Sequence, residues 1–429
     1  MNLAAIQRTL LKLVVMIGGE AMQSAFHLAL NLLLLHFVSA RDYGIFALVM
    51  VIGGIGLTYI RAFTALPASI AISQSHSETS ANAYEITFGT AATLLSITFG
   101  LAMAGVLRAW IDEGEMIGGA FVGLWTLRAH IRTVFFARKR QLLVAASDLA
   151  FTLSGALGAT WVVWNGQHIL QHTFVALVIA NALGIAVMLA FNRRRVRLST
   201  GIHFWRRYKR LWRDLKWSLL SVTITNIQGQ GMALLVAAMA GPAAYAPIAA
   251  ALVFFVPLRI VSTAFANMIH PEMARLMARR QFAAVGRLLR RWPFLLAVFG
   301  LLYGAAVLIA LPFIQPESLD DTRFFKISVL AWIMSALPML YVMPRIWLEI
   351  AQDFRAIAIL SAIAAVAGLL LVLAILLTTT PSWALLGGAV SEAIVLVGTW
   401  AIVRPRQKAE ERRSAHASQP PGADDSPTR

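Results

Sequence analysis

The sequence contains no cysteine, and only 13% of its 429 residues are charged. The absence of cysteine excludes disulfide bonds, thiolate nucleophiles and cysteine-ligated metal sites. Acidic residues are also scarce, with 20 against 37 basic residues. Because 59% of the residues are hydrophobic and the mean hydropathy is +0.72, a water-soluble fold of this length is excluded. We therefore expect a polytopic membrane protein.

Apolar spans of about 19–28 residues recur along the whole chain, and each is long enough to cross a bilayer as a helix. The twelve predicted spans cover residues 11–38, 43–66, 84–106, 116–136, 142–164, 173–191, 217–239, 243–266, 292–314, 325–345, 357–377 and 383–403. The loops between them are short, and no loop is large enough to form an extramembrane catalytic domain. A membrane-embedded glycosyltransferase, ligase or polymerase is therefore disfavoured, and we expect a transporter, not an enzyme.

The basic residues predict the orientation of the chain in the membrane. With both termini in the cytoplasm, nearly all lysines and arginines fall on the cytoplasmic side, and the outer loops hold only Arg41, Arg108, Arg323 and Lys326. This pattern predicts a multi-pass membrane protein with both termini in the cytoplasm; the resemblance described below implies the bacterial inner (cytoplasmic) membrane. Because topology explains the basic excess, no nucleic-acid partner is expected.

The spans group into two halves. We expect an N-terminal six-helix bundle over 1–191, a basic amphipathic cytoplasmic linker helix over 192–216, and a C-terminal six-helix bundle over 217–403. The linker helix places aromatic residues on one face and arginines on the other, typical of a helix in the membrane interface; it is a topological anchor, a lipid-headgroup contact or a hinge. Residues 404–429 lack apolar periodicity and predict a disordered cytoplasmic tail.

The two halves resemble each other. Tyr43, in the turn ARDYGIF, matches Tyr245 in GPAAYAP. Arg61 and Arg259 lie late in the spans that follow these turns, and we expect Pro67 and Pro271 to close those spans. Weak internal symmetry of this kind is typical of transporters in which two bundles rock around a central site.

The turns ARDYGIFAL and GPAAYAPIAAAL, the FVPL that follows the second turn, and the arginine-rich LRAHIRTVFFARKR segment resemble one known family. They are similar to the oligosaccharide flippases of the multidrug/oligosaccharidyl-lipid/polysaccharide (MOP) exporter superfamily, and within it to the Wzx-type polysaccharide flippases. The resemblance covers almost the whole membrane region. It implies an all-α, MATE-like fold of 12 transmembrane helices in two six-helix bundles, with the first, second, seventh and eighth spans around the cavity. The fourteen spans of the peptidoglycan-precursor flippase are not present.

The resemblance also implies a cargo and partners. The cargo would be an undecaprenyl-diphosphate-linked oligosaccharide repeat unit, moved across the inner membrane by alternating access for exopolysaccharide, capsule or O-antigen biosynthesis. Membrane lipids, a polysaccharide polymerase and its chain-length machinery are candidate partners. A proton- or sodium-coupled multidrug extruder of the same superfamily is the alternative function.

Such a cargo presents an anionic diphosphate and sugar hydroxyls, so transport needs cations and neutral polar groups but no covalent chemistry, cofactor or metal. Arg128 lies near mid-bilayer, and cargo contact and an ion pair with Asp148 are equally open for it. The more cytoplasmic arginines could instead extend their side chains to the membrane surface. The candidate cargo-binding residues are Arg61, Arg128, Arg132, Arg259, Arg345, Asn31, Asn226, Gln228 and Gln230.

Acidic and histidine side chains within the spans are candidates for ion coupling. Glu20 and His27 lie on one polar stripe of the first span, together with Ser24 and Asn31. We expect these two residues to couple transport to proton entry; the alternative is that they form hydrogen bonds across the bundle. The candidate coupling residues are Glu20, His27, Asp148 and Glu392.

Overall fold

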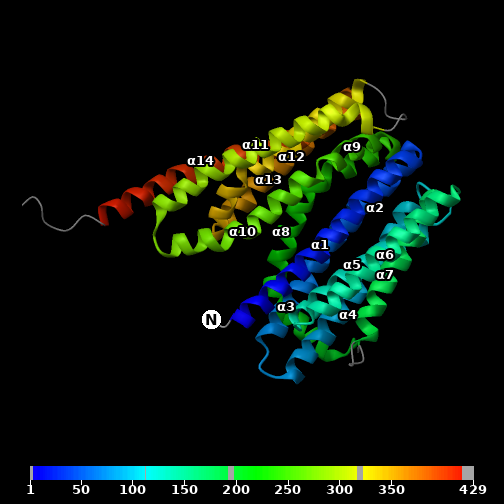
Figure 1. Cartoon of the computed structure of the whole chain (residues 1–429), viewed down its shortest axis with the longest axis horizontal. Helices are drawn as coiled ribbons and strands as arrows, with labels where there is room; N and C mark the ends of the chain where they lie inside the picture. Colours follow the sequence, from blue (N-terminus) through cyan, green and yellow to red (C-terminus); the bar gives the residue numbers. More distant parts are fainter. Residues whose placement is uncertain (1–2, 112, 192–197, 316–321, 418–429) are drawn as a thin grey trace, which may run out of the picture. The chain divides into compact units, whose positions relative to one another are not determined.

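The computed structural model describes residues 3–111, 113–191, 198–315 and 322–417, which are almost entirely helical. The chain divides into two compact units (Figure 1). Unit 1 comprises residues 1–226 and 241–246, and unit 2 comprises residues 227–240 and 247–429. The boundary at Asn226 falls inside a helix, nine residues after the predicted start of the C-terminal bundle at 217.

Unit 1 is built from antiparallel helices joined by short turns. Its elements are α1 (Leu3–Phe37), α2 (Ala40–Ile60), the π-helix η1 (Arg61–Ala65), α3 (Leu66–Gln74), α4 (Glu78–Leu107), α5 (Glu115–Ala137), α6 (Gln141–Asn165) and α7 (Ile169–Ala190). The π-helix joins α2 and α3 into one continuous span from Ala40 to Gln74. Two further helices, α8 (Ile202–Ala240) and α9 (Pro242–Phe254), contribute residues to both units.

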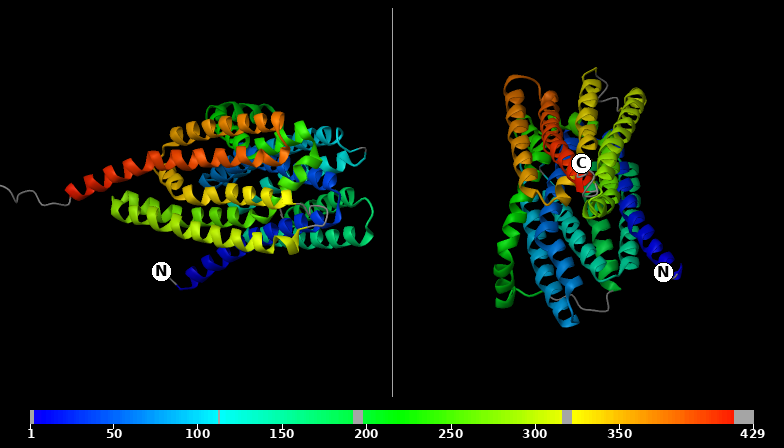
Figure 2. Two further views of the ribbon diagram at one scale, coloured as in Figure 1. Left: turned by 90° about the horizontal axis from the view of Figure 1, so that it is seen from above. Right: turned by 90° about the vertical axis from the view of Figure 1, so that its left-hand side faces the viewer.

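Unit 2, like unit 1, consists of helices joined by short connections. Its elements are α10 (Val256–Ala278), α11 (Phe282–Ile314), α12 (Thr322–Ile350), α13 (Phe354–Thr378), the short 3-10 helix η3 (Pro381–Ala384) and α14 (Leu385–Ala417). Helix α14 packs against α12 and α13, and its C-terminal part extends past the other helices of its unit (Figure 2).

The prediction of an all-helical membrane protein is confirmed, and each predicted span lies on a helix. Nine helices in the described part are long and apolar enough to cross a membrane, or ten if the bent pair α9 and α10 forms one span. The sequence predicted twelve spans. The difference concerns mainly α1, whose apolar stretch in the described part is limited to Ala21–Phe37, and α5, which carries Glu115, Arg128 and Arg132.

Close backbone contacts between glycines hold neighbouring helices together in each unit. A Cβ atom on Gly119 of α5 would lie 2.5 Å from the carbonyl oxygen of Gly100 on α4. In unit 2, a Cβ atom on Gly387 of α14 would lie 2.6 Å from the carbonyl oxygen of Gly368 on α13. Small residues at such positions let membrane helices approach closely, and this packing replaces the hydrophobic driving force that is absent in lipid.

The two turns that resemble each other in sequence lie together in unit 1. Ser39 caps α2 by accepting a hydrogen bond from the backbone N–H of Asp42 (3.1 Å). Tyr43 and Tyr245 are both buried, and a Cβ atom on Gly44 would overlap the carbonyl of Pro242. The close approach explains why a glycine follows the Asp-Tyr pair.

Some predicted boundaries differ from the structure. Pro67 and Pro271 do not close their spans, since the helices continue to Gln74 and Ala278. The amphipathic segment is continuous with the seventh predicted span in α8, and α14 continues past Val403 to Ala417. The first part of the predicted tail, 404–417, is therefore helical, and residues 418–429 lie outside the described part.

Candidate functional site

A buried ion-pair cluster forms the polar centre of unit 1. Nη2 of Arg128 on α5 lies 2.8 Å from Oδ1 of Asp148 on α6, with side chains only 3% and 1% exposed. Nη2 of Arg132 lies 2.9 Å from Oδ2 of the same carboxylate, and its Nε lies 3.1 Å from both oxygens. Of the two roles that the sequence left open for Arg128, the ion pair with Asp148 is therefore present. Asp148, a candidate for ion coupling, is held by two guanidinium groups.

The surroundings of this cluster are tightly packed. The Cζ atom of Arg128 lies 4.1 Å from the ring centroid of Phe151. A Cβ atom on Gly19 would lie 2.7 Å from Oδ2 of Asp148, and one on Gly184 would lie 2.7 Å from Nε of Arg128. This packing encloses the pair, so its role in the described conformation is structural.

Two polar side chains of α1 border the cluster. Gln23 accepts a hydrogen bond from Nη1 of Arg128 at 3.4 Å. The ring of His27 is tilted against those of Trp125 and Phe151, with centroid distances of 5.6 Å and 5.7 Å. Within the described residues, Nδ1 of His27 and Nε2 of Gln23 are buried without a hydrogen-bond partner. The side chain of Glu20, the predicted partner of His27 in proton coupling, lies outside the described part.

His130, on the same helix as Arg128 and Arg132, contacts the span that contains the π-helix. Nδ1 of His130 lies 3.0 Å from Oγ1 of Thr64 in the π-helix, and Thr64 donates to the carbonyl of Ile60 (2.7 Å). Both side chains are buried. Arg61 begins this π-helix and is exposed, without an ion pair to any described residue.

The matching span of the second repeat is bent. Helices α9 and α10 meet at Phe255 with a bend of 50°, and Pro257 lies in the first turn of α10. Arg259 lies two residues after Pro257 and is exposed, and it forms no ion pair with any described residue. Each repeat therefore carries an exposed arginine at a departure from regular α-helix: a π-helical turn in the first repeat and a bend in the second.

The remaining predicted residues fall into local contacts. Asn31 donates to the carbonyl of His27 (2.8 Å), and Asn226 donates to Oγ1 of Thr58 (2.7 Å). Gln228 and Gln230 are half-buried on the part of α8 that belongs to unit 2.

In unit 2, Arg345 contacts Glu349, with Nε 3.2 Å from Oε1. Glu392 accepts a hydrogen bond from the hydroxyl of Tyr341 (2.6 Å).

Sequence reasoning missed the role of Tyr208, on the amphipathic part of α8. Its hydroxyl donates to the carbonyl of Phe63 in the π-helix (3.1 Å). Pro67, four residues after Phe63, has no N–H to donate to that carbonyl. Burial raises the pKa of Tyr208, which keeps the hydroxyl protonated. Pro67 was the sequence signal for such a contact. Because it cannot donate an N–H to the carbonyl of Phe63, that carbonyl needs another donor.

Arg207 holds the same segment of α8 in place. Its Nη1 donates to the carbonyl of Ala83 (2.6 Å) and to Oγ1 of Thr87 (2.9 Å) on α4. The amphipathic segment is thus fixed to unit 1 at α4 and at the π-helix. Figure 1 shows α8 continuing from this segment as a single helix.

Comparison with proteins of known structure identifies the fold of the chain. No protein-family model matches the chain, and no curated protein sequence matches it. An inward-facing multidrug resistance MATE family transporter of the MOP superfamily superposes with a TM-score of 0.72 at 10% identity, covering 94% of this chain and 99% of that one. The chain has the MATE-like fold.

Two further structures share this fold. The lipid II flippase MurJ, in an inward closed conformation, gives a TM-score of 0.67 at 10% identity over 95% of this chain and 91% of that one. A MOP superfamily transporter from Pyrococcus furiosus Vc1 (DSM3638), described as having a binding pocket of reverse polarity, gives 0.56 at 10% identity over 93% and 95%. The MATE-like, multi-pass architecture is therefore confirmed over nearly the full length.

Proposed function

We propose that this protein is a Wzx-type flippase of the MOP superfamily. It moves undecaprenyl-diphosphate-linked oligosaccharide repeat units from the cytoplasmic to the periplasmic leaflet of a bacterial inner membrane, for surface polysaccharide biosynthesis. The observation that carries the proposal is the pair of exposed arginines, Arg61 at a π-helical turn of its span and Arg259 just after the bend between α9 and α10.

The position of these arginines suits a diphosphate. Arg61 lies about 31 Å along its span from Ala40, and Arg259 about 26 Å along its span from Pro242, at 1.5 Å per residue. In a hydrocarbon core of ~30 Å, both would lie near the cytoplasmic boundary in the predicted orientation. A guanidinium group there can form bidentate hydrogen bonds with a phosphate as the headgroup leaves water. The π-helical turn in one span and the bend in the other allow each span to adjust around the bound headgroup.

The acidic side chains support an anionic cargo over a cationic one. Asp148 is neutralised by two arginines, and Glu392 is bonded to Tyr341. Each described carboxylate of the predicted spans thus has a partner, whereas Arg61 and Arg259 have no carboxylate partner among the described residues. A cationic drug would need the opposite arrangement. The amides of Gln228 and Gln230 suit the sugar hydroxyls of the cargo.

A multidrug extruder is the second candidate function, because the MATE transporter superposes with a TM-score of 0.72 against 0.67 for the lipid II flippase. The lipid II flippase nevertheless makes a lipid-linked cargo compatible with this fold. The membrane-embedded glycosyltransferase, ligase or polymerase gains no support, since the matched structures named above are transporters and a flippase.

Coupling to protons is proposed for Glu20 and His27. His27 and Arg128 both contact the ring of Phe151, so a proton taken up by His27 would repel Arg128 and weaken the packing of the polar centre of unit 1. A proton entering with ~100 mV would supply about 2.3 kcal/mol, which biases a two-state transporter. A polysaccharide polymerase and its chain-length machinery would take up the cargo on the outer side.

The experiment is a deletion in the organism that makes the chain, followed by mass analysis of undecaprenyl-diphosphate-linked glycans. A flippase predicts accumulation of the complete repeat unit, which wild type and Arg279→Gln relieve and the double variant Arg61→Gln/Arg259→Gln does not. Arg279 is a matched control, because it is an exposed arginine at the end of α10. Intact surface polysaccharide without accumulation would instead support the drug extruder, and cation efflux would then be measured.

A further inference from the structure

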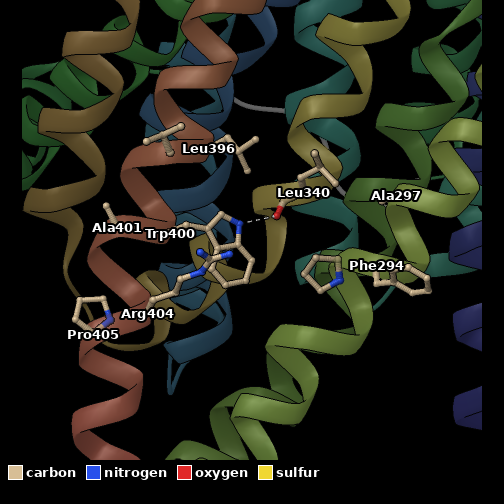
Figure 3. A pocket seen from close by; sticks show the side chains of 10 residues that line it. Phe294, Ala297, Leu340, Leu396, Trp400, Ala401, Arg404 and Pro405 are labelled. Carbon is tan, nitrogen blue, oxygen red and sulfur yellow. Dashed lines mark hydrogen bonds between the residues drawn. The ribbon is translucent and has the colours of Figure 1, made fainter.

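A groove on unit 2 lies between α11 and α14, with α12 as its floor (Figure 3). Its volume of 640 Å³ falls within the range of about 300–1,000 Å³ that is typical of ligand sites. Pro293 and Phe294 line one wall, and Leu396, Val397 and Trp400 line the other. Phe294 and Val397 are 67% and 68% exposed, so the groove opens to the side of the helices. In a membrane-spanning unit, this side contacts lipid.

The floor of the groove is held by a specific hydrogen bond. Nε1 of Trp400 donates to the carbonyl of Leu340 at 3.0 Å, as drawn in Figure 3. Pro344, four residues after Leu340, has no N–H for this carbonyl. The indole therefore satisfies an orphan acceptor and is fixed in one orientation. A preformed wall of this kind lowers the entropic cost of binding a chain.

One end of the groove is cationic. The Cζ atom of Arg404 lies 4.9 Å from the ring centroid of Trp400, so the guanidinium covers the end of the apolar wall. One helical turn further along each wall lies another cation. Arg290 lies four residues before Phe294 on α11, and Lys408 lies four residues after Arg404 on α14; both are exposed. Three cations thus follow the apolar rows at the end where the predicted topology places the cytoplasm.

We infer that this groove binds one acyl chain of an anionic membrane phospholipid, with the lipid phosphate contacting Arg404, Arg290 and Lys408. The apolar walls suit a hydrocarbon chain, and the cations are complementary to a phosphate at the membrane surface. A neutral apolar ligand would leave the cations unused, and a free anion would leave the apolar walls unused. The inference concerns a resident lipid of unit 2, and it holds whether the transported cargo is a lipid-linked glycan or a drug.

The test uses the purified full-length chain in liposomes that contain a photoactivatable phosphatidylglycerol with a diazirine on its acyl chain. The parallel sample contains phosphatidylcholine with the same labelled chain. Cross-linked peptides are mapped by mass spectrometry. We expect phosphatidylglycerol cross-links to concentrate on residues 290–301 and 396–405, at least fivefold above phosphatidylcholine.

Three variants separate the site from bulk lipid. Arg404→Gln/Arg290→Gln should reduce the phosphatidylglycerol signal about tenfold, since hydrogen bonds to charged groups are the strong ones. Ala401→Trp places a bulky side chain in the groove at an exposed position and should remove the signal for both lipids. Arg279→Gln is the matched exposed arginine and should change nothing. Size-exclusion chromatography verifies that each variant is folded.

The outcomes decide the assignment. Equal labelling by the two lipids, or no effect of the double arginine variant, would show contact with bulk lipid only and would overturn the inference. Displacement of labelled phosphatidylglycerol by undecaprenyl phosphate at a much lower mole fraction would also overturn it, because the occupant would then be a prenyl lipid.

Discussion

Arg128 and Asp148 form an ion pair inside unit 1, with Nη2 and Oδ1 2.8 Å apart and both side chains almost completely buried. Two charges removed from solvent in this way must neutralise each other, because either one alone would carry a desolvation cost of several kcal/mol. The pair links α5 to α6, and Arg132 adds a second cation on the same carboxylate. Arg128, the arginine that the sequence places near mid-bilayer, therefore connects two helices of the bundle in the described conformation.

This pairing predicts the effect of removing one partner. Asp148→Leu should lower the free energy of unfolding by about 3–5 kcal/mol, because Arg128 and Arg132 then lose the carboxylate that neutralises them. The triple variant Arg128→Leu/Arg132→Leu/Asp148→Leu should recover more than half of this loss, because no charged member of the cluster then remains without a partner. Thermal unfolding of the purified protein in detergent measures both. A loss below about 1 kcal/mol for the single variant would contradict the structural role.

The hydrogen bond from Tyr208 to Phe63 predicts a coupling with Pro67. Tyr208→Phe should cost about 1 kcal/mol, because the Phe63 carbonyl loses its donor. In a Pro67→Ala background the new backbone N–H can serve that carbonyl, so the same substitution should cost much less. A double-mutant cycle on unfolding temperatures gives the coupling energy. Equal costs in the two backgrounds would show that the proline does not create the need for Tyr208.

A cap at the predicted cytoplasmic end of α13 predicts a pH dependence. Asp353 accepts from Nη1 of Arg406 (2.6 Å) and from the backbone N–H of Ala356 (3.1 Å), and the hydrogen bond from Arg406 is the larger cause of the lowered pKa of Asp353. Because the folded pKa lies below the ordinary value of 3.8, the stabilisation is present above pH 3.8 and is lost as the pH falls through the folded pKa.

Two variants separate the charge from the cap at this position. Asp353→Asn keeps the helix cap and removes the charge, so its deficit relative to wild type should disappear in acid. Asp353→Ala also removes the cap and should cost about 1 kcal/mol more at all pH values. Unfolding temperatures from pH 7 down to about pH 1.5, well below the ordinary pKa of 3.8, test this. A deficit of Asp353→Asn that is independent of pH would contradict the ion pair.

The coupling proposal predicts a change in the pH dependence of transport. Glu20→Gln should remove the stimulation of transport by an inward proton gradient, and His27→Gln should weaken it. Cargo translocation in proteoliposomes, with and without an imposed pH gradient, is the measurement. Full transport with an unchanged pH dependence in Glu20→Gln would exclude this residue from coupling, and Ser24→Ala is a control from the same polar stripe.

Much of the architecture follows from the sequence. Apolar spans and basic loops predicted the helices, because length and hydropathy are local properties. The matching turns at Tyr43 and Tyr245 predicted an internal repeat, and in the structure both residues are buried in unit 1. The hydropathy of α5 is weakened by Arg128, His130 and Arg132, and the apolar stretch of α1 in the described part is Ala21–Phe37, so the count of apolar spans there is lower than the twelve predicted.

The candidate site was only partly accessible from the sequence. The pairing of Arg128 with Asp148 was one of two alternatives, and distinguishing them requires the packing of α5 against α6. The π-helix at Arg61 has no local sequence signature, since its extra residue is stabilised by tertiary contacts at Thr64 and Tyr208. Prolines were expected to end helices, whereas Pro67 is accommodated because a distant hydroxyl serves the freed carbonyl.

The central claim is that Arg61 and Arg259 bind the diphosphate of a lipid-linked glycan. The most direct measurement is translocation of a fluorescent undecaprenyl-diphosphate oligosaccharide in proteoliposomes. We expect wild type and Arg279→Gln to move it at equal rates, and each of Arg61→Gln and Arg259→Gln to reduce the rate about tenfold, with unfolding temperatures unchanged. Wild-type rates in both variants, or no translocation by wild type alongside efflux of a cationic dye, would contradict the account.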